Sequence, residues 1–269
     1  PHIEPEAEDF LLTRIRSMLH VNDSRRAERY VAIVDPNGPT YNAMSPEDQT
    51  FTRMLVTMIW ANQSGVQPPE TFDDALSVLR SVPAFKTELQ QVFGYRLDQS
   101  RVTPKPVSGP GAPVLFTHAD YSTAELTAAV RSAPLKKLLH LPREGVYYVS
   151  EADLDLFFVT LSKNEEDFSE TTRYADYPIS PDLFQWESQS TTKLDSKDGQ
   201  RYIHHLENNH SIYLCVRNTR LNAAGVASAF TLLGNVSHVR HSGEKPIRFE
   251  WQLHRSMPAE LYEQGRAVV

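Results

Sequence analysis

This chain of 269 residues has a single cysteine, no long apolar run and no recognisable leader. Its single cysteine, Cys215, excludes a disulfide within the chain, and the surrounding apolar run 212–216 is typical of a buried, unreactive thiol. No stretch of 18 apolar residues occurs, and no basic segment followed by an apolar one opens the chain. We therefore predict a protein of a reducing compartment, with neither a membrane span nor a signal peptide.

Signatures of catalysis are also missing. The sequence has no G-x-x-x-x-G-K-[ST] phosphate loop and no G-x-S-x-G nucleophile elbow. His204, His205 and His210 are close in sequence, but the paired cysteine or acid spacing of a zinc or hydrolytic site is absent. We therefore predict that this chain is not itself an enzyme, and that it binds no metal and needs no cofactor of its own.

Apolar residues follow a helical spacing from residue 9 to about residue 100. One predicted helix starts after Ser45, with Pro46 at its first position, and another apolar segment stops before Pro83. Residues 102–113 contain four prolines and two glycines, a composition typical of a linker. The sequence thus predicts a helical domain over 1–112 and a second domain over 113–269.

The second domain is predicted to be mainly β-structure. After a capping-box pattern from Ser122 to Glu125, short segments rich in β-branched and aromatic residues follow. The predicted strands are 146–149, 154–161, 201–205, 211–217, 230–233 and 247–253. Polar and apolar residues alternate from Arg248 to Leu253, so one face of that strand is expected to be wet. The predicted fold class is therefore α+β, with an N-terminal helical domain followed by a mixed β-barrel.

Segment 172–190 has the most informative composition in the chain, with four aromatic rings, two prolines and an acid between two tyrosines. Rings that stack and a carboxylate that accepts an amino proton are what a flipped nucleobase requires. The alternative is a structured loop whose aromatic side chains fill the edge of a core. The predicted base-pocket residues are Tyr174, Asp176, Tyr177, Phe184, Trp186 and Ser188.

Charge is distributed unevenly, although the net charge is −7. Eight acidic residues and one lysine lie in 144–170, whereas 196–256 holds eight basic residues, four acids and six of the ten histidines. A basic surface on one side of a domain favours contact with a phosphate backbone, and an ordinary solvated charge imbalance is the alternative. The predicted DNA-backbone contacts are Arg173, Lys193, Arg201, Arg240, Lys245 and Arg248.

Several blocks, in order, carry a resemblance to a known family: 158–163 through 172–174, 199–203, 214–217, 232–234 and 243–251. Together they resemble DUF3427, a domain that closes bacterial helicase-like proteins, over roughly residues 113–269. The resemblance implies an upstream phospholipase-D-type nuclease and a superfamily II ATPase in the same polypeptide, with residues 1–112 similar to the helical connector. ATP and Mg are implied only for that ATPase part.

The same family includes SauUSI-type type IV restriction enzymes, which cut DNA carrying 5-methylcytosine or 5-hydroxymethylcytosine. The resemblance therefore implies a cytoplasmic bacterial protein in which this domain reads the modified base in double-stranded DNA. Residues 174–177, followed by Trp186, also resemble the pocket segment of SRA domains. That likeness implies a PUA/SRA-like barrel in which Tyr174 and Trp186 stack on a flipped base and Asp176 faces its N4 and N3. A protein–protein module and an RNA-binding PUA-like module of a helicase are the alternatives.

Overall fold

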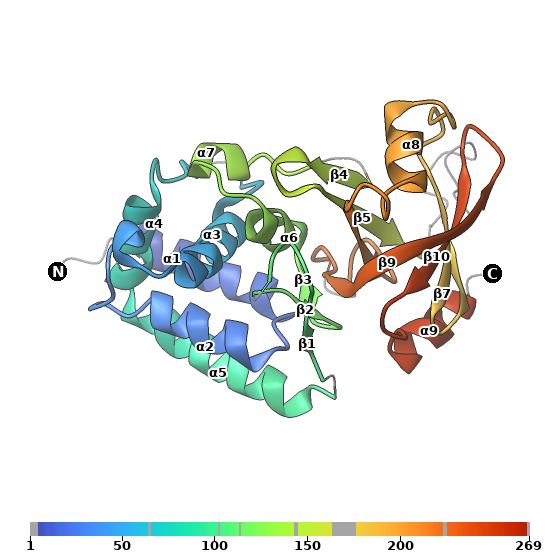
Figure 1. Ribbon diagram of the computed structural model, residues 1–269. Coiled ribbons are helices and arrows are strands. Elements are labelled where there is room, and N and C mark those ends of the chain that lie inside the picture. Colours follow the sequence, from blue (N-terminus) through green and yellow to red (C-terminus); the bar gives the residue numbers. More distant parts are fainter. Residues whose placement is uncertain are drawn as a thin grey trace. The chain divides into compact units, whose positions relative to one another are not determined.

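The computed structural model describes residues 5–63, 66–101, 103–112, 114–142, 145–162, 176–222 and 225–267. The chain divides into two compact units (Figure 1). Unit 1 comprises residues 1–106 and 111–143, and unit 2 comprises residues 107–110 and 144–269. Helices dominate unit 1 and a mixed sheet dominates unit 2, so the predicted α+β class with N-terminal helices is confirmed.

Unit 1 is built around one central helix. Its elements are α1 (Pro5–Arg14), η1 (Ile15–Met18), α2 (Ser24–Ile33), η2 (Tyr41–Ala43), α3 (Pro46–Trp60), α4 (Phe72–Ser81), α5 (Pro83–Gln99), β1 (Lys105–Pro106), β2 (Phe116–Thr117), β3 (Asp120–Tyr121), α6 (Thr123–Val130) and α7 (Leu135–Leu138). Every residue of α3 from Phe51 to Trp60 is buried, and α2, α4 and α6 all pack against it. A helix that is buried on all sides forms the core of its unit.

The helix ends follow the local sequence signals. The Ser45 side chain accepts a hydrogen bond from the backbone N–H of Asp48, and Pro46 begins α3 as predicted. α4 ends at Ser81, before Pro83. The predicted capping box from Ser122 to Glu125 is present at the start of α6.

The predicted linker is structured where it is described. Lys105 and Pro106 form β1, which pairs with β2. Residues 107–110 belong to unit 2, where the Tyr213 hydroxyl donates to the carbonyl oxygens of Ser108 (3.0 Å) and Pro110 (2.7 Å). The compact units therefore differ from the predicted division at 112/113, since residues 111–143 lie in unit 1. The physical reason is that α6 packs on α3.

Unit 2 is an antiparallel sheet with one parallel pair. Its elements are β4 (Val146–Val149), η3 (Ser150–Ala152), β5 (Leu154–Thr160), β6 (Tyr177–Ser180), β7 (Leu183–Glu187), α8 (Lys197–Ile203), β8 (Ser211–Arg217), β9 (Phe230–Ser242), β10 (Arg248–Leu253) and α9 (Ala259–Arg266). Its strands follow the order β4-β5-β8-β9-β10-β7-β6, in which β5 and β8 run parallel and the other described neighbours run antiparallel. The long strand β9, the orange-red arrow in Figure 1, pairs with β8 on one side and with β10 on the other.

A closed barrel is not found among the described strands, so this part of the prediction is corrected. β4 and β6 stand at opposite ends of the strand order. β9 pairs with β8 near its start and with β10 from Val236 to Ser242. Within the stretch that pairs with β8, Gly234 has a φ of 84°, a conformation that favours glycine, next to a register shift between Leu214 and Cys215.

One side of this sheet encloses an aromatic core, to which α8 contributes Tyr202 and α9 contributes Leu261. The predicted strand 201–205 is wrong, because residues 197–203 form helix α8. Ser196 caps that helix by accepting from the N–H of Gly199. A Cβ at Gly199 would collide with the backbone oxygen of Lys193. This capped, close-packed turn overrides the strand preference of Tyr202 and Ile203.

Among the described residues, no helix combines the length and the apolar character that a membrane crossing requires.

Candidate nucleic-acid interface

The segment predicted to be a base pocket is a β-hairpin where it is described. Tyr174 and Arg173 lie outside the described residues. From residue 177 onward β6 and β7 pair antiparallel, with Tyr177 opposite Gln185. Alternation along β7 directs Phe184 and Trp186 into the core and leaves Gln185 and Glu187 on the other face. The aromatic and polar residues of this segment therefore serve different sides of the sheet.

Trp186 and Phe184 are core residues rather than stacking platforms. The Trp186 ring stacks on Phe157 at 4.1 Å between centroids and 18° between planes, and it meets the edge of Tyr202. Phe184 is 1% exposed and Trp186 is 4% exposed. A ring already packed in this way offers no face to a nucleobase, so we remove both residues from the pocket. For them the alternative reading, aromatic side chains that fill a core, fits the structure.

The side chains of Asp176 and Ser188 both accept hydrogen bonds from the backbone at the C-terminal end of β7. The Asp176 carboxylate accepts from the N–H of Glu187 at 2.9 Å. The fully buried Ser188 hydroxyl accepts from the N–H of Ile247, also at 2.9 Å. These bonds fasten β7 to its neighbours, which is a structural role that the sequence did not indicate.

A groove runs across the outer, polar side of β6, β7, β10 and β9. It combines a hollow of about 490 Å³ with an adjoining hollow of about 240 Å³. We call it the outer groove, and it is lined by Tyr177, Pro178, Ile179, Gln185, Arg240, His241, Ser242, Arg248, Glu250 and Arg266. Arg248 and Glu250 are the more exposed members of an alternating strand, so the predicted wet face of this strand is confirmed.

Two arginine–glutamate pairs cross the groove between neighbouring strands. Arg240 lies 2.6 Å from Glu250, and Arg248 lies 3.2 Å from Glu187. The arginine side chains are 73% and 53% exposed, whereas the glutamates are 14% and 10% exposed. Both guanidinium groups are therefore accessible from solvent, whereas the carboxylates are largely covered.

The other predicted backbone contacts fall into two kinds. Arg201 is held by Asp155 at 2.7 Å and Asp198 at 2.7 Å, and its guanidinium lies 4.1 Å from the Tyr148 ring centre. With two acids beside it and a side chain only 16% exposed, Arg201 stabilises the fold, and we withdraw it as a phosphate contact.

Lys193 and Lys245 are exposed and lie on neighbouring loops. The N–H of Lys245 donates to the carbonyl of Thr192, and the N–H of Leu194 donates to Glu244. These bonds hold the two loops together, so both lysines remain available beside the strand face that carries Arg248.

Two histidines of unit 2, His205 and His210, are part of the packing. His205 donates from Nδ1 to the carbonyl of His210 and accepts at Nε2 from the N–H of His238, so it is neutral in this arrangement. Burial, more than the neighbouring histidines His210 and His238, lowers the pKa of His205 to about 4. His210 bonds to the buried carboxylate of Asp155. Within the described ranges no group of three or more histidine, cysteine or acidic side chains is arranged to hold a metal ion.

Sequence reasoning missed seven groove residues: Pro178, Ile179, Gln185, His241, Ser242, Glu250 and Arg266. The signal for Gln185 and Glu250 was available, since both alternate with large apolar residues along their strands. His241 and Arg266 depend on the strand pairing and on helix α9, which alternation does not reveal.

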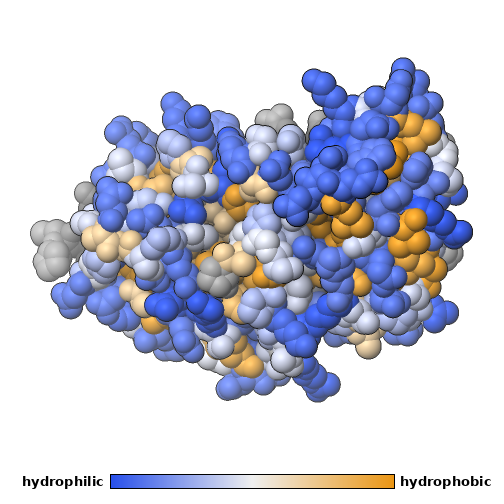
Figure 2. Space-filling view, viewed as in Figure 1, coloured by the Kyte–Doolittle hydropathy of each residue, from blue (hydrophilic) through white to orange (hydrophobic). Residues whose placement is uncertain are grey.

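Exposed apolar side chains of unit 2 are spread over several elements; they are Tyr148, Ile179, Leu206, Leu221 and Val239. The face seen in Figure 2 shows separate apolar areas among hydrophilic residues. Large continuous apolar patches are typical of protein–protein interfaces. The face in view has the scattered pattern of ordinary surface.

The profile of the family described as Domain of unknown function (DUF3427) matches residues 118–264. The chain belongs to this family. A search of curated proteins found no match. The DUF3427 match contains the whole outer groove apart from Arg266, and it also contains β3 and α6, which lie in unit 1.

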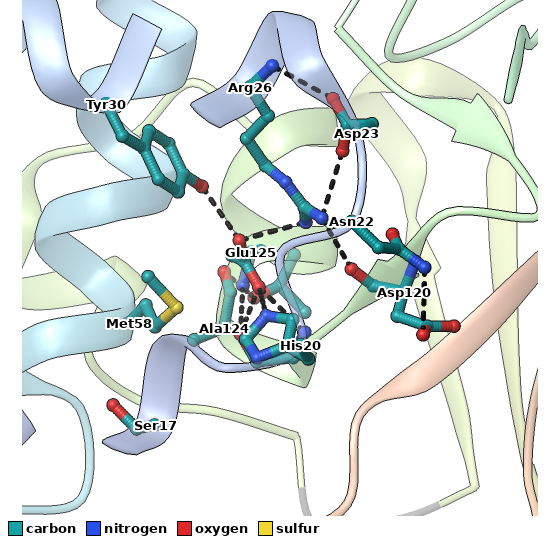
Figure 3. A network of polar contacts seen from close by, with 12 residues as sticks. Ser17, His20, Asn22, Asp23, Arg26, Tyr30, Met58, Asp120, Ala124 and Glu125 are labelled. Atoms are coloured by element: carbon teal, nitrogen blue, oxygen red, sulfur yellow. Dashed lines mark hydrogen bonds and ion pairs between the residues drawn. The ribbon is translucent and has the colours of Figure 1, made fainter. Parts of the chain in front are cut away.

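The unit 1 part of the DUF3427 match carries a buried polar network, shown in Figure 3. The Glu125 carboxylate receives hydrogen bonds from Arg26 (3.0 Å) and Tyr30 (2.8 Å) and pairs with His20. The Asn22 amide donates to Asp120 at 3.0 Å. Burial alone would raise the pKa of the Glu125 carboxyl, but His20 and Arg26 hold it well below its usual value. This network ties the start of the family segment to the helices that precede it.

Proposed function

We propose that unit 2 is a DNA-binding module that reads 5-methylcytosine or 5-hydroxymethylcytosine in duplex DNA by base flipping. The observation that carries the proposal is the outer groove, in which exposed arginines form ion pairs with less exposed glutamates and Tyr177 is also part of the lining. Phosphate contacts need mobile cations at a surface, and reading a cytosine needs an acceptor for its amino group. The groove has both kinds of group within one strand face.

The chemistry assigns a role to each part of the groove. Glu250 would accept from the N4 amino group of cytosine, replacing Asp176, whose carboxylate is bonded to the backbone. Tyr177, whose hydroxyl donates to Gln185 at 3.1 Å, would stack against the base. Arg240, Arg248 and Arg266 would contact phosphates. A methyl at C5 adds only about 0.8 kcal/mol when buried, so the discrimination expected from one site is modest.

The wider setting is also part of the proposal and rests on the family resemblance. The open sheet would be a relative of the PUA/SRA barrels. The chain would guide an ATP-dependent type IV restriction enzyme of the bacterial cytoplasm to modified foreign DNA. ATP and Mg would bind the upstream ATPase, a nuclease would make the cut, and this chain would recognise DNA without catalysing a reaction. An RNA-binding module is the other class that a basic groove can serve.

Binding to matched duplexes tests this proposal. We expect at least several-fold tighter binding to a duplex with 5-methylcytosine or 5-hydroxymethylcytosine than to the same unmodified duplex, measured by fluorescence anisotropy. An RNA duplex of the same sequence tests the alternative that this chain binds RNA. Equal affinity for modified and plain DNA would contradict base reading, and tighter binding to RNA would favour the other class.

Removing the groove arginines should weaken binding to every duplex. We expect Arg240→Ala and Arg248→Ala each to lower affinity for modified and plain DNA about equally, and to reduce the slope of log affinity against log salt by about one unit. Arg29→Ala is the matched control, because Arg29 is an exposed arginine of unit 1 that also pairs with an acid. An unchanged salt slope in both groove variants would place the phosphate contacts elsewhere.

A further inference from the structure

Polar side chains of the outer groove surround the acid assigned to the amino group of cytosine. Glu250 on β10 lies directly opposite Gln185 on β7 and opposite Arg240 on β9. Arg248 is two positions earlier on β10, so it lies on the same face of the sheet. Directly opposite residues on one face of a sheet have Cβ atoms about 5 Å apart. Glu250 is therefore bordered by polar or charged groups on both neighbouring strands and toward the start of its own strand.

The apolar part of the groove lining lies farther away. Pro178 and Ile179 are on β6, and β7 separates β6 from β10 in the strand order. Neighbouring strands are about 4.8 Å apart, so β6 lies about 10 Å from the strand of Glu250. The larger hollow extends to β6, whereas the smaller hollow of about 240 Å³ is lined by residues of β7, β9 and β10. The lining beside Glu250 is thus polar, and the apolar lining begins at β6.

The place of a C5 substituent in this groove follows from the chemistry of cytosine. C5 is bonded to C4, the ring atom that carries the amino group, so the amino group and the substituent lie side by side on one edge of the base. If the amino group donates to Glu250, the substituent lies next to the same carboxylate and its polar neighbours. A methyl group gains affinity only where apolar atoms surround it. A hydroxyl group donates one hydrogen bond and accepts others, so it suits a polar lining.

Several groups around Glu250 can form such bonds. Arg240 donates to Oε1 of Glu250 at 2.6 Å, and an ionised carboxylate has two oxygens that each accept more than one hydrogen bond. The Arg240 guanidinium is exposed, and Ser242 carries an exposed hydroxyl opposite Arg248. A hydroxymethyl group would exchange hydrogen bonds with these groups. A methyl group would instead separate them from water, which is unfavourable for polar groups.

We propose that the outer groove reads C5 substituents that carry a hydroxyl group, so that 5-hydroxymethylcytosine is the preferred base and 5-methylcytosine is bound less tightly. This inference rests on the proposed function, since it assumes that Glu250 receives the amino group of a flipped cytosine. It decides between two bases that the proposed function leaves open. One hydrogen bond of ordinary strength corresponds to a change in affinity of about fivefold.

Three duplexes of one sequence test the inference: a plain duplex, one with 5-methylcytosine and one with 5-hydroxymethylcytosine at the same position. We expect the whole protein to bind the hydroxymethyl duplex about five- to tenfold more tightly than the methyl duplex, measured by fluorescence anisotropy. Tighter binding to the methyl duplex, or equal affinity for the two modified duplexes above that for the plain one, would overturn the inference and leave the proposed function standing. Equal affinity for all three would contradict the proposed function itself.

Gln185→Met gives a second readout. Methionine is an unbranched side chain of similar length without the polar amide, so the variant places an apolar group opposite Glu250. We expect the ratio of hydroxymethyl to methyl affinity to fall by at least about threefold, because one polar neighbour of the substituent is lost and an apolar one is gained.

The matched control is Gln252→Met. Gln252 is on the same strand as Glu250 but outside the groove lining, and its amide donates to the backbone carbonyl of Asp182 at 2.8 Å. This variant should keep the wild-type ratio of affinities. An unchanged ratio in Gln185→Met, with a melting temperature equal to that of the wild type, would show that the polar lining does not read the substituent. If Gln185→Met is destabilised, the three duplexes with the wild-type protein decide the inference alone.

Discussion

Replacing Glu125 with alanine should lower the free energy of unfolding by about 3–5 kcal/mol, the cost typical of breaking a buried ion pair by removing one partner. Glu125 and Arg26 are both fully buried, and the substitution removes one of the two acids that pair with the guanidinium, leaving only Asp23 at 3.0 Å. It also removes the acceptor of the Tyr30 hydroxyl and half of the capping box of α6. Urea unfolding followed by circular dichroism measures the effect.

The matched control is Glu47→Ala. Glu47 pairs with Arg25 at 2.6 Å in the same unit, where both side chains are partly exposed to solvent. An exposed pair contributes about 0–1 kcal/mol, so the control should unfold almost like the wild type. Equal losses in the two variants would show that the buried network is no more important than a surface ion pair.

Lowering the pH should reduce the contribution of this buried network to the free energy of unfolding. Because the pKa of Glu125 is lowered in the folded protein, its contribution to stability is present above the ordinary glutamate value of about 4.5 and is lost as pH falls below it. Glu125→Gln removes the titrating group while keeping the shape. The difference in unfolding free energy between wild type and Glu125→Gln should therefore shrink on acidification.

Replacing Trp186 with alanine should cost about 3–5 kcal/mol of unfolding free energy, as large aromatic deletions in cores do. The ring packs against Phe157, Tyr202 and Phe249, so its removal opens a cavity in the aromatic core of unit 2. Differential scanning calorimetry should show a lower melting temperature. Trp186→Phe keeps an aromatic ring in place and should recover part of the loss.

Tyr177→Ala provides the contrast that separates packing from binding. Tyr177 is partly exposed and lines the outer groove, so its removal should change stability little and weaken binding to modified DNA through lost stacking, by about 1–3 kcal/mol. If Trp186→Ala instead kept its melting temperature and lost only DNA binding, its assignment to the core would be wrong.

Local signals determined much of the fold in advance. The caps at Ser45 and Ser122, the end of α4 before Pro83 and most strands of unit 2 agree with the sequence pattern. These features depend on residues that are neighbours along the chain. The parallel pairing of β5 with β8 and the shared strand β9 depend on distant segments, which periodicity does not specify.

The candidate site was harder to predict because segment 176–188 contributes residues to both faces of the sheet. Prolines and small polar residues around Asp176 favour a loop, although Phe184 and Trp186 alternate with Gln185 and Glu187. Alternation shows that two residues face the same side, but it does not show which side is covered. Strand pairing with β10 decides that question here.

Domain families usually spread by recombination of segments that fold on their own. In this chain the DUF3427 segment does not coincide with one compact unit. Its first strand and helix supply Asp120 and Glu125 to the interior of unit 1. A gene fusion carrying residues 118–264 alone would separate these groups from Asn22 and Arg26. We therefore expect the helical unit and the family segment to be inherited as one block wherever this buried carboxylate is kept.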